Sequence, residues 1–80
     1  MREINIPIEE FAEKFKQEYN FLYEANAYVA GYNEAVAEGD EFIQKHGDFV
    51  GEFVRYRGDV LSSDREVAAF MFALESFGVL

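Results

Sequence analysis

The stretch from Ser63 to about Phe77 constrains the fold most, because it reads as a helix with apolar residues on nearly every side. Ser63 and Glu66 have the spacing of a capping box, in which the serine hydroxyl accepts a backbone N–H and the glutamate reaches back to the serine N–H. Apolar residues then recur at helical spacing at Val67, Phe70, Met71, Leu74 and Phe77, with Ala68, Ala69, Phe72 and Ala73 beside them. A helix that is apolar on most sides is usually enclosed by other helices. We therefore expect an all-α domain with this helix at its centre.

Composition limits the remaining fold classes. The 80 residues suit one domain, and half of them are hydrophobic, which favours a folded chain. The absence of cysteine excludes disulfides, and with only one histidine the usual structural zinc sites cannot be built within one chain. No apolar run approaches the roughly 20 residues of a membrane span. We expect a cytoplasmic protein without metal, cofactor or membrane association.

The N-terminal half predicts an extended arm followed by a long helical stretch. Ile4 and Ile6 alternate with polar residues over about 1–6, and Pro7 suits the first position of a helix. A helical stripe then continues to about residue 38. We favour one long or gently kinked helix over 7–38, with two helices joined near Asn26 or Gly31 as the alternative.

The middle of the chain predicts one further helix, over about 40–57. Gly39 suits the left-handed residue after a helix end, and Asp40 suits an N-cap. Gly47 and Gly51, four residues apart, would leave a shallow groove for a neighbouring helix. Gly58 would end the helix, and the whole is a three- or four-helix array with a short N-terminal arm.

Side chains that could perform catalysis are scarce. The only serines are Ser62, Ser63 and Ser76, and the capping box accounts for the first two. His46 lies on the apolar stripe of its helix, where a partly buried structural histidine is the favoured interpretation over a general base. We predict no catalytic residue and a protein that is not an enzyme. A small-molecule binder or enzyme that uses an aromatic pocket remains the last-ranked alternative.

Charge is the strongest functional signal. Sixteen acids against seven bases give a formal net charge of −9, which repels nucleic acid and attracts basic surfaces, although solubility alone also explains it. Seven acids and two lysines between residues 8 and 38 give a local balance of −5. Acids three or four apart on a helix lie about 5–6 Å apart, and DNA phosphates repeat about every 3.4 Å per strand. A row of acids along a helix can therefore compete with DNA phosphates for the same basic groove, although its charges are more widely spaced.

These observations predict a small acidic interaction module that inhibits or regulates a basic or nucleic-acid-handling protein. Its predicted partner-binding residues are Glu9, Glu13, Tyr23, Glu24, Tyr28, Tyr32, Glu34 and Glu38. In bulk composition the chain resembles small phage anti-defence proteins, including anti-CRISPR proteins and DNA mimics, which would imply action in a host cytoplasm. Reversal of Glu9, Glu13 and Glu24 to lysine is expected to abolish partner binding. The alternative is a homo-oligomeric assembly protein, such as a homodimer, joined through residues 25–37, the Gly47/Gly51 groove or the arm.

Overall fold

The protein folds into four α-helices in a computed structural model, which describes residues 4–24, 32–58 and 61–79, apart from the side chains of residues 32 and 33. The helices are α1 (Ile8–Glu24), α2 (Tyr32–Lys45), α3 (Gly47–Arg57) and α4 (Asp64–Ser76). No strand occurs within these ranges. The predicted all-α architecture is confirmed.

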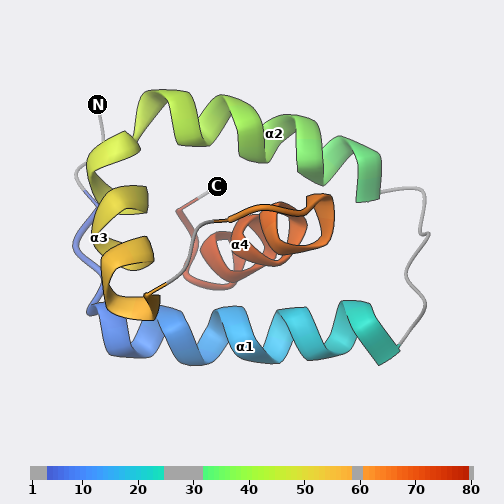
Figure 1. Ribbon diagram of the computed structural model, residues 1–80, viewed down its shortest axis with the longest axis horizontal. Helices are drawn as coiled ribbons and strands as arrows, with labels where there is room; N and C mark the ends of the chain where they lie inside the picture. The colour runs from blue at the N-terminus through green and yellow to red at the C-terminus, as the bar shows by residue number, and fades with distance from the viewer. Residues whose placement is uncertain (1–3, 25–31, 59–60, 80) are drawn as a thin grey trace.

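Helix α4 lies between α1 and α2, which run in opposite directions along its two sides, and α3 crosses one end of the array (Figure 1). Seven residues of α4 are buried, including Phe70 and Leu74, neither of which is exposed at all. The prediction that the last helix is enclosed by the others is confirmed.

Helix α4 is capped at both ends, and the cap at its first end was predicted from the sequence. The Ser63 hydroxyl accepts the backbone N–H of Glu66 at 3.2 Å, which is the expected N-cap contact. At the other end Gly78 has a positive φ of 71°. The N–H groups of Gly78 and Val79 bond to the carbonyls of Glu75 and Leu74, as in a Schellman motif. Val79 packs on the core and so anchors the chain after α4.

A cluster of phenylalanines joins the helices. The Phe11 ring of α1 makes edge-on contacts with Phe49 and Phe53 of α3 and with Phe70 of α4, at centroid distances of 5.2, 5.0 and 4.9 Å. Phe42 connects α2 to the same cluster through Phe70, at 5.9 Å. Edge-to-face pairs add about 0.5–1.5 kcal/mol each to the stabilisation from burial. Ile4 and Ile6 of the N-terminal arm are half-buried against this core.

The favoured prediction of one helix over 7–38 is wrong. Residues of that range form α1 and the first half of α2, which lie on opposite sides of α4 and run in opposite directions (Figure 1). The physical reason is burial: α4 is apolar on most of its circumference, and two helices on opposite sides cover it where one long helix cannot. The suggested junctions at Asn26 and Gly31 lie outside the described residues.

The predicted helix boundary at Gly39 and Asp40 is also wrong, since α2 continues through both. Gly39 is buried, and a Cβ atom built there would lie 2.5 Å from Cγ1 of Val67 and 2.8 Å from Cγ of Met71. The glycine therefore allows α2 to approach α4 closely, on the same buried face as Ala35 and Phe42.

The chain changes direction at His46, so the predicted helix over 40–57 is two helices. His46 has φ −126° and ψ 42°, outside the helical region. The turn directs Phe49 and Phe53 into the core that Phe42 enters from α2. Gly58, with φ 78°, ends α3 as predicted.

The groove expected at Gly47 and Gly51 receives no described neighbour, because a Cβ at either position would have nothing within 4 Å. The glycine that admits a neighbouring helix is Gly39 instead.

Candidate functional site

The predicted acidic residues of α1 lie along its solvent-facing side. Glu9, Glu13 and Glu24 are all exposed, and they point to within about 60° of one another around the helix axis. Glu9 and Glu24 are about 22 Å apart along the axis, at 1.5 Å per residue. Lys16 is exposed on the same side and interrupts the row. This row is therefore long and mixed in charge.

Helix α2 carries a denser acidic surface. Glu34, Glu38 and Glu41 are exposed at positions i, i+4 and i+7, which places them on one face within about 10 Å. We call these three residues the α2 row. Asp40 is also exposed, about 100° around the helix axis from Glu41, and no basic residue occurs between positions 34 and 41. Lys45 ends the row and forms an ion pair with Glu41 at 2.9 Å.

Glu34 and Glu38 were among the predicted partner-binding residues, but Glu41 was not. The predicted boundary at Gly39 assigned Glu41 to a different helix. The spacing itself was the available signal, since 34, 38 and 41 keep helical periodicity through the glycine.

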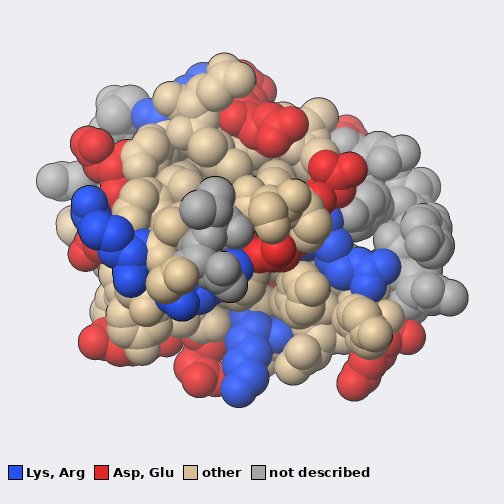
Figure 2. All heavy atoms as spheres, in the orientation of Figure 1, with Lys and Arg blue, Asp and Glu red and all other residues tan. Residues whose placement is uncertain are grey.

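The eight predicted partner-binding residues do not form one surface. Those of α1 and those of α2 lie on helices at opposite sides of α4 (Figure 1). Figure 2 shows Asp and Glu side chains along the upper edge, over α2, and along the lower edge, over α1, with Lys and Arg side chains between and among them. A flat partner can therefore cover one acidic helix at a time.

Of the predicted tyrosines, the structure places one. Tyr23 is 66% exposed, and the guanidinium of Arg65 lies over its ring at 5.3 Å from the centroid. Tyr28 lies outside the described residues, as does the side chain of Tyr32. Tyr56 of α3, which was not among the selected residues, is 55% exposed. Its position off the apolar stripe of α3 was the signal for this exposure.

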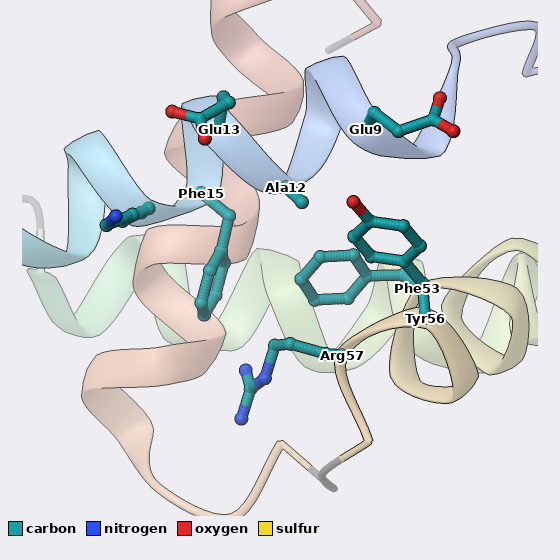
Figure 3. Close-up of a pocket in the computed structure, with 8 residues that line it drawn as sticks. Glu9, Ala12, Glu13, Phe15, Phe53, Tyr56 and Arg57 are labelled. Atoms are coloured by element: carbon teal, nitrogen blue, oxygen red, sulfur yellow. The ribbon is translucent and has the colours of Figure 1, made fainter.

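A hollow of about 320 Å³ lies between α1 and α3, and Figure 3 shows how its walls are arranged. Phe15 stands on one side, Phe53 and Tyr56 on the other, and Ala12 between them on α1 (Figure 3). The charged lining residues are Glu9, Glu13, Lys16 and Arg57.

Arg57 forms the base of this hollow and links α3 to α4. Its Nη2 donates to Oε2 of Glu66 at 2.7 Å, and the two side chains are only 19% and 15% exposed. The guanidinium carbon also lies 5.0 Å from the Phe15 centroid and 5.8 Å from that of Phe53. The charge of Arg57 is therefore balanced by an adjacent carboxylate and lies against two aromatic rings.

The residues weighed for catalysis have structural contacts. The half-exposed His46 ring lies 4.4 Å from that of Phe42, in agreement with the partly buried position that was predicted. The Ser76 hydroxyl donates to the Phe72 carbonyl at 3.0 Å, and the Ser63 hydroxyl caps α4. Within the described ranges, no three His, Asp or Glu side chains gather as a metal site, and no helix has the length and apolarity to cross a membrane.

Comparison with known proteins identified no relative of this chain. No protein-family model matches the chain, and neither a curated protein nor a solved structure shows significant similarity to it.

Proposed function

We propose that this protein is a small acidic interaction module that binds a basic surface on a partner protein, with the α2 row as its principal contact. The observation that carries the proposal is the alignment of Glu34, Glu38 and Glu41 on one exposed helix face. The first two carboxylates form no ion pair with another described residue. They are available to the basic groups of a partner.

The energetic cost of this arrangement supports a role in binding. Like charges at i, i+4 destabilise a helix by about 0.2–0.5 kcal/mol per pair, so the row weakens α2 slightly. Only Glu34, in the first turn, gains from the positive end of the helix dipole. Solubility requires charge but not its alignment on one face.

The chemistry of the row favours partners that handle nucleic acids. Such proteins present basic grooves to phosphates, and a row of carboxylates about 5–6 Å apart competes for the same groups. By occupying the groove the module inhibits or regulates its partner. Phage anti-defence proteins are one class with this composition and mode of action.

The test is a pull-down from cells of the source organism with the tagged protein and two charge-reversed variants. The first variant is Glu34→Lys/Glu38→Lys. The control is Glu52→Lys/Glu75→Lys, which makes the same change in net charge at exposed positions of α3 and α4. We expect the wild type and the control to retain a basic protein at low salt and to release it at high salt. The first variant should not retain that protein at either salt concentration. Equal retention by all three proteins would reject the α2 row as the contact.

A homo-oligomeric assembly protein is the second candidate. Phe21 is 59% exposed on α1, and the Gly47/Gly51 side of α3 is open, so both offer surface to a second copy. The measurement that tests this second candidate is the oligomeric state of the protein in solution.

A further inference from the structure

The hollow between α1 and α3 combines an apolar interior with charge at its rim. Phe53 is fully buried and Phe15 is 8% exposed, while the Tyr56 ring stands largely in solvent beside them. The volume of about 320 Å³ is at the lower end of the range for small-ligand pockets, about 300–1,000 Å³. The size suits one side chain of a partner rather than a helix.

The unbalanced charge at the rim is negative. Glu9 and Glu13 stand on α1 on either side of Ala12, directed along the rim and not over the aromatic rings (Figure 3). Both are exposed, and neither forms an ion pair with another described residue. Arg57 is compensated by Glu66, which leaves Lys16 as the opposing charge in the lining. With a molecular charge of −9 behind it, the rim attracts a cation.

The protein itself shows how such surroundings hold a guanidinium. The guanidinium of Arg57 lies against the rings of Phe15 and Phe53 and forms an ion pair with Glu66, and the guanidinium of Arg65 lies over the Tyr23 ring. Tyr56 offers a similar exposed ring, and Glu9 and Glu13 offer the carboxylates. A planar guanidinium stacks on aromatic rings and pairs with carboxylates better than a lysine ammonium does.

We propose that this hollow binds an arginine side chain of a partner protein. The apolar stem lies against Phe15 and Tyr56, and the guanidinium stacks on the Tyr56 ring within the negative charge that Glu9 and Glu13 give the rim. The proposal goes beyond the proposed function, because α1 and the α2 row lie on opposite sides of α4 (Figure 1). Either can fail without the other.

The probe is a blocked peptide with a single arginine between glycines, titrated into isotope-labelled protein and followed by amide chemical shifts. The matched control peptide carries citrulline, which has the same shape without the charge. We expect the arginine peptide to shift the amides of Ala12, Phe53 and Tyr56, with the citrulline peptide binding about tenfold more weakly or not at all. Equal binding of the two peptides would overturn the proposal.

Variants then separate the hollow from the general charge of the molecule. Glu9→Gln/Glu13→Gln and Tyr56→Ala should each weaken the arginine peptide about fivefold. Lys16→Gln should strengthen it about twofold, since it removes the opposing charge. The control Asp48→Asn/Glu75→Gln makes the same change in net charge at exposed positions of α3 and α4 that do not line the hollow, and it should leave affinity unchanged. If this control weakens binding as much as Glu9→Gln/Glu13→Gln, attraction is non-specific and the hollow is not the site.

Discussion

At the scale of a single residue, Gly39 determines how closely α2 approaches α4. Val67 and Met71 occupy the space that any side chain at this position would need. Two glycines of α3, by contrast, face open space, so the same residue type has opposite roles in neighbouring helices.

We predict that Gly39→Ala destabilises the protein. Overpacking costs about 1–3 kcal/mol, and the better helix propensity of alanine returns up to about 1 kcal/mol, so a net loss of about 1–2 kcal/mol is expected in urea unfolding. Gly51→Ala is the matched control, because its methyl group would meet nothing within 4 Å in the interior of α3. It should stabilise the protein by up to about 1 kcal/mol. Two changes of the same sign would contradict this account of Gly39.

At the scale of the elements, the ion pair of Arg57 and Glu66 fixes the end of α3 to the start of α4. Glu66 also accepts from the Ser63 hydroxyl at 3.3 Å, so one carboxylate serves the cap and the interhelical contact together. The partial burial of both side chains limits screening by solvent.

Glu66→Gln is therefore expected to lower the free energy of unfolding by about 1–3 kcal/mol, since it removes the negative charge that faces a mostly buried guanidinium. Glu75→Gln is the control on the same helix. Glu75 is exposed in the last turn, where a negative charge is unfavourable, so its neutralisation should be neutral or slightly stabilising. Thermal or urea unfolding measures the stability of both variants. A Glu66→Gln protein as stable as the Glu75→Gln control would show that the Arg57–Glu66 ion pair does not stabilise the fold.

The elements also show what the sequence could and could not predict. Ser63 and Glu66 predicted the start of α4 correctly because a cap is local chemistry between residues three apart. Gly39 led to the wrong helix boundary, because a glycine that follows a helix end and a glycine at a helix crossing cannot be distinguished in the sequence until the partner helix is known. The turn at His46 had no signal, since the histidine side chain makes no cap hydrogen bond and packing of Phe49 and Phe53 drives the turn. The predicted acids were correctly placed on exposed faces, but their division between two sides of the molecule depends on that tertiary packing.

At the scale of the whole molecule, charge and apolar surface oppose one another. Copies that each carry −9 repel one another. The large apolar side chains exposed in the described residues are Phe21, Tyr23 and Tyr56, and Arg65 covers part of Tyr23.

We predict a monomer in sedimentation at high micromolar concentration and moderate salt. The Glu34→Lys/Glu38→Lys variant, whose two reversals of two charges each change −9 to −5, should remain monomeric as well. A fixed multiple of the monomer mass would favour the assembly alternative, and loss of that multiple in Phe21→Ser would place the interface on α1.

The central position of α4 has a consequence for synthesis. The ribosome makes α1, α2 and α3 before the helix that they enclose, so the nascent chain displays three apolar faces without their common partner. Stable tertiary structure must wait for Phe70 and Leu74 to emerge, and folding follows translation of α4 rather than accompanying that of α1. A chain truncated before α4 would lack the helix at the centre of the core, and we expect it to be unfolded and open to proteolysis.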